Sequence, residues 1–264
     1  MFILHLETNA AEKDLLIAEL WERGTAGVTE QNVPGGGCTL AAYFEHRFDA
    51  SEFAAYNPRW EAAENRDWIA VAQSLWTPVL VGSRFYLAPA WSDEPAPPGR
   101  FRIDMDPGQA FGTGWHTSTQ LCLEAMERCV RPGDSVLDVG TGTGILCLAA
   151  SLLGASPIYA CDIDPAAVAS ASARFRSGGV PVGLFTGSVR SVRDAAADVI
   201  VANINAETLM ALAPEICRIR KPQGRAILSG FSVRDAERVR RAFGGCSETL
   251  EKEDWAALVC LSPA

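Results

Sequence analysis

The spacing of apolar and polar residues divides the chain into two parts of different regularity. Phe2–Glu7 alternates with a period of two, as strands do, and Glu12–Arg23 has helical spacing that ends before Gly24. Two further strands are predicted at Ala26–Gln31 and Cys38–Glu45. A strand, a helix and two strands in this succession favour a small α+β domain of the ferredoxin-like kind.

The next stretch has a weaker pattern. Residues 46–66 are expected to connect two units, and a short helix is predicted at Asp67–Leu75. Three strands are then expected at Pro78–Val81, Phe85–Trp91 and Phe101–Asp106.

From His116 onward strands and helices alternate regularly. The predicted strands are Ser135–Val139, Ile158–Cys161, Val182–Phe185, Asp198–Ala202, Arg225–Ser229 and two final strands, the last at Trp255–Leu261. Helices are predicted to begin at Thr117, Gly144, Pro165, Ala206 and Ser232, with Thr117 and Gln120 spaced for a capping box. This alternation predicts a doubly wound α/β fold, with a mainly parallel seven-stranded sheet and an antiparallel last strand.

Composition and charge limit the classes of partner that this chain is expected to bind. The 264 residues carry a formal charge of −9, and no basic stripe of the kind that holds nucleic acid is visible. Arg238–Arg241 is interpreted as a solvated helix face, and the acidic surplus suits a basic protein partner. No apolar run is long enough to span a bilayer, and His5 and Glu7 interrupt the N-terminal apolar stretch too early for a signal peptide.

The eight cysteines carry no metal-site spacing. None forms a Cys-x-x-Cys pair, and no zinc-ligand pattern arises with the three histidines, so no metal is predicted. Most of the cysteines lie among Leu, Val and Ala and are interpreted as small core hydrophobes, which predicts a reducing, cytoplasmic setting.

The sharpest chemical signal is a buried strand that runs into a glycine turn. Gly140, Gly142 and Gly144 follow the strand that ends at Val139, in the place where open α/β sheets bind ligands. A dinucleotide fingerprint needs a third glycine where Ile145 stands. The Gly-x-Gly-x-Gly spacing instead favours S-adenosylmethionine, which lies on bare backbone at Gly140 and Gly142 and whose ammonium group needs an anion, for which Asp138 is the candidate.

Two acidic residues end the second strand. Asp162 lies twenty residues beyond Gly142, where a carboxylate accepts hydrogen bonds from both hydroxyls of a ribose. Asp164 precedes Pro165, the kind of residue that starts a helix, and is predicted to be an N-cap.

The ends of the third and fourth strands offer two polar candidates. Ser188 is placed for adenine contacts, although a plain turn serine is the alternative. Asn203 follows the run Val199–Ala202, where its carboxamide oxygen could orient an incoming amine next to the sulfonium. Capping the helix that begins near Ala206 is the alternative for Asn203.

The segment before the first helix of this region is glycine-rich and aromatic. Phe111 and Trp115 lie on it and would give a closing lid an apolar surface over the cofactor. Thr119 falls in the first helical turn, where free N–H groups favour the methionine carboxylate. His116 is either a catalytic base or, as for most histidines at helix starts, structural.

These motifs resemble those of the ribosomal protein L-eleven methyltransferases (PrmA). The resemblance is carried by DPGQAFGTGWHTST, VLDVGTGTGIL, ACDIDP and VIVANINAE, and it runs from about residue 67 to the end. It implies S-adenosyl-L-methionine as cofactor, held by Thr119, Gly140, Asp162 and Asn203. Ser118 replaces the first of two threonines that the family usually has at this point.

The resemblance also implies an activity and a domain plan. The expected reaction is methylation of lysine or N-terminal amines of a large-subunit ribosomal protein. The expected domains are 1–58 for substrate recognition, 59–98 as a linker, and 99–264 for cofactor binding, in a chain that is a monomer.

Three other functions stay open at this point. The first is methylation of another protein, RNA or a small molecule. The second is a nicotinamide-dependent oxidoreductase, against which Ile145 argues. The third is a binding module that has kept the glycine turn without catalysis.

Overall fold

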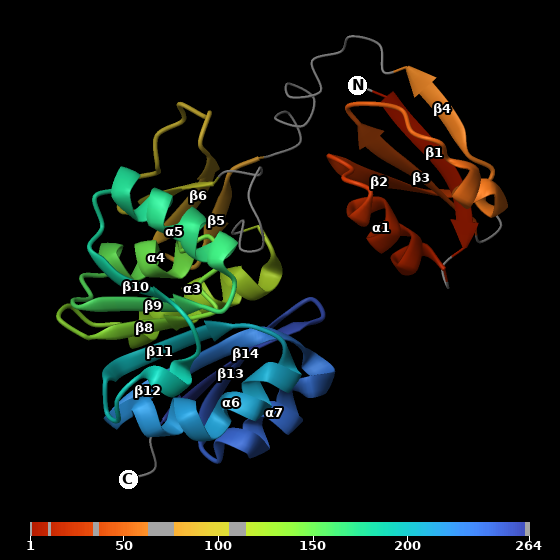
Figure 1. Cartoon of the computed structure of the whole chain (residues 1–264). Coiled ribbons are helices and arrows are strands. Elements are labelled where there is room, and N and C mark those ends of the chain that lie inside the picture. The colour runs from red at the N-terminus through yellow and green to blue at the C-terminus, as the bar shows by residue number, and fades with distance from the viewer. Residues whose placement is uncertain (1, 10–11, 34–36, 63–76, 106–114, 262–264) are drawn as a thin grey trace. The chain divides into compact units, whose positions relative to one another are not determined.

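The computed structural model describes residues 2–9, 12–33, 37–62, 77–105 and 115–261, and the chain divides into two compact units between residues 75 and 76 (Figure 1). The predicted helix at 67–75 and the lid segment with Phe111 lie outside the described residues. The elements of the first unit are β1 (Phe2–Asn9), α1 (Lys13–Glu22), β2 (Gly27–Val33), β3 (Gly37–Phe44), the 3-10 helix η1 (Ser51–Tyr56) and β4 (Arg59–Ala62).

The first unit is an antiparallel sheet with its own core. Its strand order is β2-β3-β1-β4, and β1 pairs antiparallel with both β3 and β4. Leu4, Leu6 and Leu40 of the sheet are buried with Leu16 and Leu20 of α1. The order of elements is that of the ferredoxin-like motif with η1 in the place of the second helix, and membership of that fold stays a prediction.

The boundary between the units differs from the expected limits at 58 and 98. β4 pairs with β1, so residues 59–62 belong to the first unit. The three-stranded sheet β5 (Val79–Val81), β6 (Phe85–Pro89) and β7 (Phe101–Met105) belongs to the second. Its apolar side chains join the main core of that unit, which explains why this stretch does not stand apart as a linker.

The second unit has the predicted alternation. Its remaining elements are α3 (Thr117–Cys129), β8 (Val136–Val139), α4 (Ile145–Leu152), β9 (Ile158–Asp162), α5 (Pro165–Ser177), β10 (Val182–Thr186), η2 (Val189–Ser191), β11 (Ala197–Asn203), α6 (Ala206–Ile219), β12 (Arg220–Ser232), η3 (Val233–Asp235), α7 (Ala236–Phe243), β13 (Cys246–Lys252) and β14 (Trp255–Leu261).

These strands form one seven-stranded sheet in the order β10-β9-β8-β11-β12-β14-β13. The first five are parallel, and β14 is antiparallel to both β12 and β13. The chain therefore winds outward from β8 in one direction and from β11 in the other, which confirms the doubly wound fold.

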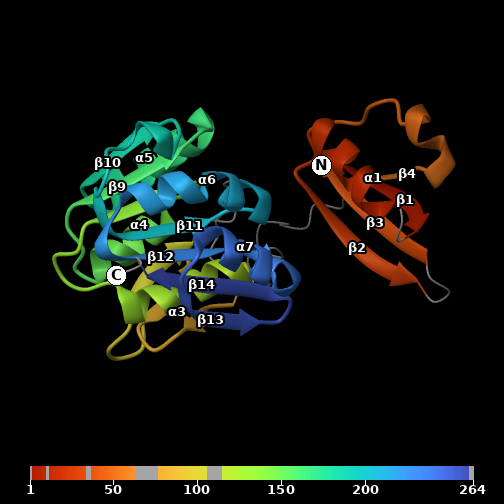
Figure 2. The ribbon, with the colours of Figure 1, turned by 90° about the horizontal axis from the view of Figure 1, so that it is seen from below.

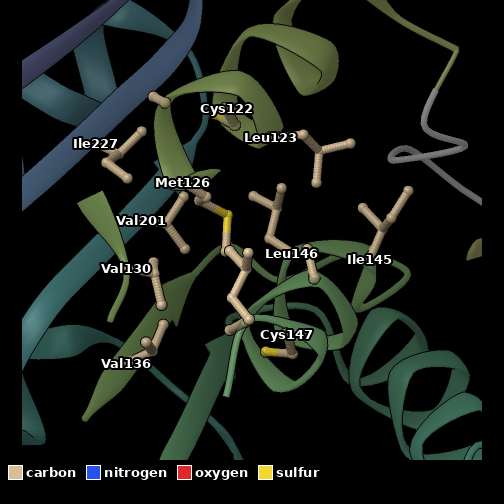
Figure 3. Close-up of a cluster of buried hydrophobic side chains, with 14 of the residues drawn as sticks. Cys122, Leu123, Met126, Val130, Val136, Ile145, Leu146, Cys147, Val201 and Ile227 are labelled. Carbon is tan, nitrogen blue, oxygen red and sulfur yellow. The ribbon is translucent and has the colours of Figure 1, made fainter. Parts of the chain in front are cut away.

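Helices cover both faces of the sheet (Figures 1 and 2). α3, α4 and α5 bury their apolar side chains on one face, and α6 and α7 bury theirs on the other. Figure 3 shows the first of these clusters, where Met126 of α3 and Leu146 of α4 pack with Val136, Val201 and Ile227 of three adjacent strands. Burial on both faces explains why the parallel strands are continuous apolar runs.

Helix caps show where local prediction holds and where it fails. Asp164 caps α5, because its Oδ1 accepts from Ala166 N at 2.8 Å, as predicted. The predicted capping box of Thr117 and Gln120 is wrong. Thr117 Oγ1 donates to Glu253 at 2.8 Å instead, and the N-cap of α3 is His116.

The cysteines need one correction. Cys246 and Cys260 form a disulfide, because the antiparallel pairing of β13 and β14 puts them opposite each other. They are therefore not the core thiols that the sequence predicts, and the predicted reducing setting loses their support. Cys217 is half-buried, and the thiols Cys38, Cys122, Cys129, Cys147 and Cys161 are buried as predicted.

Over the described ranges of the chain, none of the helices is long and apolar enough to cross a membrane.

The arginines of α7 are ion-paired on its exposed surface, where Arg238 meets Asp235 and Arg241 meets Glu237. This confirms that Arg238–Arg241 is a solvated helix face.

Candidate active site

The candidate site lies at the carboxyl edge of the parallel strands, where the winding direction changes between β8 and β11. Val139 pairs with Ala202 across these strands, so the segments that follow them leave the sheet side by side. Ligands of open α/β sheets bind at such a switch point. The glycine turn and Asn203 are thereby brought to the same place.

The glycine turn has the backbone shape that its residues predict. Gly140, Gly142 and Gly144 have φ angles of 72°, 52° and 81°, which residues with a Cβ rarely adopt. A Cβ at Gly144 would also lie 2.4 Å from the ring of Phe175 on α5. Gly140 N and Thr141 N both donate to Cys161 O, at 2.9 and 3.1 Å, which ties the turn to the end of β9.

Asp138 lies beneath this turn and is fully buried. Its Oδ2 accepts from Thr141 Oγ1 at 2.7 Å and from Cys147 Sγ at 3.5 Å, whereas Oδ1 has no partner among the described residues. Burial raises the pKa of this carboxyl to about 6. Asp138 thus supports the turn through Thr141, and its predicted contact with an ammonium group stays a prediction.

Asp162 ends β9 and faces the glycine turn. Its Oδ2 accepts from Gly142 N at 3.0 Å, and its Oδ1 accepts from Asp164 N at 3.0 Å. A carboxylate oxygen has two lone pairs, so each oxygen keeps one acceptor position. The half-buried carboxylate is therefore held in a fixed orientation and can still accept two hydroxyl groups.

Asn203 and Thr119 meet from segments far apart in the sequence. Asn203 Nδ2 donates to Thr119 Oγ1 at 3.0 Å, and the Thr119 side chain is buried. Asn203 Oδ1 is buried and accepts no hydrogen bond from any residue that the structure describes. The alternative role of Asn203 as a cap is wrong, because Asn205 caps α6 through Thr208 N at 2.8 Å.

Ser188 lies farther along the same edge, beyond the end of β10. It is the N-cap of η2, where its Oγ accepts from Arg190 N at 3.4 Å. The turn-serine alternative describes this contact, and the adenine contact stays a prediction. The predicted contact of Phe111 falls outside the described residues.

His116 has a structural environment. Its Nδ1 lies 2.7 Å from Ser118 Oγ and accepts from Ser118 N at 3.3 Å, and its ring meets the edge of Trp255 at 4.3 Å between centroids. Burial lowers the pKa of the imidazole, although nearby Glu253 opposes this shift. These contacts fit a helix cap better than a catalytic base.

Several contacts of this site join residues that local sequence patterns do not bring together. The end of β13 reaches the start of α3, where Lys252 Nζ donates to Gln120 Oε1 at 2.7 Å. Gln120 Nε2 in turn donates to Trp115 O at 2.8 Å. Ile204 and Gly230 also line the edge, and a glycine followed by an aromatic residue at Gly230-Phe231 is the only hint that the sequence gives of a tight approach there.

The fold and this edge together define a class of protein. The site has a glycine turn at the switch point, a carboxylate held against it, and a buried carboxamide oxygen without a partner among the described residues. These are the parts of a nucleoside-cofactor enzyme of the doubly wound α/β class. The family model of the ribosomal protein L11 methyltransferase (PrmA) matches residues 11–262, and the chain belongs to this family.

Individual relatives agree with this assignment. The ribosomal protein L11 methyltransferase of Geobacillus kaustophilus is 41% identical over 205 residues, which cover 75% of this chain and 65% of that protein. The same enzyme of Symbiobacterium thermophilum is 36% identical over 209 residues, covering 78% of this chain and 68% of that protein. The chain thus spans about two thirds of the length of these relatives.

A solved structure gives the same result for the fold. The ribosomal protein L11 methylase of Lactobacillus delbrueckii subsp. bulgaricus superposes with a TM-score of 0.64 at 28% identity, over 70% of this chain and 96% of that one. The mainly parallel, Rossmann-like sheet of the methyltransferases is therefore the fold of the second unit.

The cofactor of this family is S-adenosyl-L-methionine, and the residues present fit it. Gly140 and Gly142 are half-buried and have no side chain where the nucleoside would rest, and Asp162 offers two acceptor positions to a ribose. The Oδ1 of Asn203, which no residue in the described part of the chain engages, is an acceptor for an amine or ammonium N–H.

Proposed function

We propose that this chain transfers methyl groups from S-adenosyl-L-methionine to amines of a large-subunit ribosomal protein of the L11 type, on lysine side chains or the N-terminal amine. The names of its relatives support the substrate. One observation of the structure supports amine chemistry more than any other, which is the buried carboxamide oxygen of Asn203 that accepts no hydrogen bond from the described residues.

The proposed role of Asn203 follows from the free-energy cost of leaving its buried Oδ1 without a hydrogen bond. Leaving a buried acceptor unpaired costs about 1–3 kcal/mol, so a ligand that donates to it recovers that energy. The bond from Nδ2 to Thr119 Oγ1 fixes which end of the amide faces the site. An N–H of the incoming amine would donate to Oδ1, which would leave the nitrogen lone pair free to accept the methyl group.

Asn203 is also proposed to contact the cofactor, and other residues supply the remaining contacts. Asp162 accepts from the ribose hydroxyls, and the backbone of Gly140 and Gly142 supports the nucleoside. Thr119 lies in the first turn of α3, where the positive end of the helix dipole favours the methionine carboxylate. When bound, S-adenosyl-L-methionine supplies a methyl group made electrophilic by its sulfonium.

The amine must be neutral to react. A lysine with a pKa of about 10.4 costs about 4.6 kcal/mol to deprotonate at pH 7. A desolvated site beside a positive charge lowers that cost. Within the described part of the site, His116 is engaged with Ser118 and Asp138 lies buried under the turn, so water is the proposed proton acceptor.

The first unit is proposed to recognise the protein substrate, chiefly through residues 1–58. In β3, Leu40 and Ala42 are buried against α1, while the alternate residues Thr39, Ala41 and Tyr43 are half-buried on the other face. Among the described residues, α1 packs on the first face of this sheet, and no helix packs on the second. The net charge of −9 supports a basic protein partner. A cytoplasmic setting and a monomeric state are part of the same proposal.

The test uses the full chain, labelled S-adenosylmethionine and purified ribosomal proteins. A single labelled large-subunit protein is expected, with mass spectrometry assigning methyl groups to amine nitrogens. Replacing Asn203→Ala should lower the single-turnover rate about 100-fold or more while the cofactor still binds. Label on RNA alone, or on no ribosomal protein, would contradict the proposal.

Asn205→Ala is the matched control. It is an asparagine two residues away that caps α6 and is exposed. Its replacement should cost about 1 kcal/mol of stability and leave the rate within a factor of about two. Equal rate losses in both variants would remove the orienting role of Asn203.

A further inference from the structure

Ile204, which follows Asn203, fills the space left by two missing side chains. A Cβ at Gly140 would lie 2.5 Å from Ile204 Cγ2. A Cβ at Gly230 would lie 2.6–2.8 Å from the backbone O, N and C atoms of Ile204. Cβ contacts below 3.0 Å are essentially never seen in proteins, so Ile204 can occupy this place only because both neighbours are glycines.

The two contacts come from different parts of the edge. Gly140 belongs to the turn that follows β8, and Gly230 lies at the irregularity of β12, between Leu228 and Phe231. Ile204 N also donates to Ser229 O at 3.0 Å, which ties its peptide to β12. The Cγ2 methyl is thus the contact between this anchored peptide and the glycine turn.

This arrangement separates two aspects of how Asn203 is placed. The bond to Thr119 fixes the rotation of the carboxamide, whereas the position of its backbone depends on the peptide that continues into Ile204. We propose that Ile204, held between Gly140 and Gly230, is a positioning residue that sets the spacing between the cofactor turn and the Asn203 carboxamide. The proposal rests on the proposed function, because it concerns the same site.

Rate is expected to depend on this spacing more than cofactor affinity does. The reacting groups must be held within about 0.5 Å of their productive geometry, and a misplacement of about 1 Å can cost about 100-fold in rate. The ribose contact at Asp162 does not involve Ile204. Loss of the Cγ2 methyl should therefore change kcat while the Kd of S-adenosylhomocysteine stays nearly constant.

The first experiment compares Ile204→Val with Ile204→Ala. Valine keeps both γ carbons and loses only Cδ1, whereas alanine loses the methyl that touches Gly140. At saturating cofactor and substrate, the alanine variant should lose roughly 10-fold in single-turnover rate and the valine variant less than about 2-fold. The Kd of S-adenosylhomocysteine should change by less than about 3-fold in both.

Equal rate losses in the two variants, or a lower Tm with an unchanged rate, would overturn the proposal.

The second experiment needs no methyl acceptor, so it remains decisive even where the proposed substrate is wrong. Gly140→Ala should weaken S-adenosylhomocysteine binding about 30-fold in the parent chain, because the new Cβ meets Ile204 Cγ2. In the Ile204→Ala background the same change should cost about 5-fold or less, because the space is free. The strain of alanine at a φ of 72° is common to both backgrounds and cancels in the comparison.

Gly230→Ala is the matched control. Its Cβ would meet backbone atoms of Ile204, which Ile204→Ala does not remove. Its effect on binding and on Tm should therefore be the same in both backgrounds. Additive effects of Gly140→Ala and Ile204→Ala, or equal relief at Gly140 and Gly230, would contradict the assigned contact.

Discussion

Polar side chains at the two ends of strands β8 and β11 differ in how completely they are hydrogen-bonded. At the amino end, Asp198 accepts from Ser135 N, Ser135 Oγ and Lys221 Nζ at 2.9, 2.6 and 2.7 Å. At the carboxyl end, Asp138 Oδ1 and Asn203 Oδ1 are buried and have no partner among the described residues. The same two strands thus end in a satisfied cluster on one side and in unsatisfied acceptors on the other.

The pKa values of the two carboxyl groups separate in the same way. Burial raises the pKa of Asp138 to about 6. For Asp198 burial also acts upward, but the hydrogen bonds from Lys221 and Ser135 outweigh it and lower the pKa to about 2. Buried polar atoms without partners are rare in folded proteins and carry a cost in stability. The difference indicates that the amino end serves stability and that the carboxyl end is prepared for a ligand.

The largest effect is expected at Asp162, because it tests whether the carboxyl end binds the nucleoside. Hydrogen bonds to a charged group contribute about 1.5–3 kcal/mol each, so Asp162→Ala should raise the Kd of S-adenosylhomocysteine about 100-fold or more. Calorimetry measures this directly. Asp164→Ala is the control, since it removes the cap of α5 and should cost about 1 kcal/mol of stability with little change in Kd. An unchanged Kd in the Asp162 variant would contradict the conclusion that the carboxyl end of the strands binds the nucleoside.

Asp138 should make the cofactor-free protein less stable as the pH rises. Its folded pKa lies above the unfolded value, so its favourable contribution is complete below pH 4 and is lost as the pH passes 6. Asp138→Asn imitates the protonated acid and lacks this dependence. At pH 8 the variant should be more stable than the parent by about 2–3 kcal/mol, and at pH 4 the two should agree. Urea unfolding of both proteins at pH 4 and pH 8 measures this difference. A variant that is less stable than the parent at both pH values would refute the prediction.

The contribution of Asp198 to stability should have the opposite pH dependence. Its folded pKa is depressed, so its contribution is present above pH 4 and is lost as the pH falls toward 2. Asp198→Asn should cost about 1–2 kcal/mol at pH 7, a figure reduced for the partial exposure of the pair. The loss should shrink at pH 3, and the Kd of S-adenosylhomocysteine should stay within about 2-fold. A large change in Kd would show that the amino end also serves binding.

The smallest effect is expected at His116, which starts the helix that carries Thr119. The imidazole accepts from Ser118 N only when neutral, and its folded pKa is lowered, so the cap is present above pH 6.5 and is lost on acidification. His116→Asn keeps a capping side chain that does not titrate. Between pH 7 and 5 the parent should lose at most about 1 kcal/mol relative to this variant. Parallel stability curves would exclude the cap.

Much of the second unit is predictable from local pattern. The strands and helices from Thr117 to Leu261 follow from hydrophobic periodicity, because parallel strands covered on both faces must be continuously apolar. The cap at Asp164 is also local, since the acceptor and Ala166 N are two residues apart. The prediction of the Thr117 and Gln120 capping box failed because Glu253 and Lys252, from the far end of the chain, take those side chains.

The cysteine pair shows the same limit. Cys246 and Cys260 are 14 residues apart, and nothing in their flanking residues distinguishes them from the buried thiols. Only the pairing of β13 with β14 makes them partners. The domain boundary at residues 75 and 76 is a further case, because it depends on which sheet β4 and β5 join.

The sequence alone determined the doubly wound fold, the glycine turn and the placement of Asp162 and Asn203 at strand ends, because these depend on residues near one another in the chain. Only the tertiary structure decided that Asn203 Nδ2 binds Thr119, that its Oδ1 has no donor among the described residues, and that Ile204 fits between Gly140 and Gly230. Asn203 and Thr119 are 84 positions apart in the sequence, and Ile204 lies 64 positions from Gly140 and 26 from Gly230. Hydrophobic periodicity and local spacing report which element a residue belongs to, whereas the close packing of elements fixes which atoms meet.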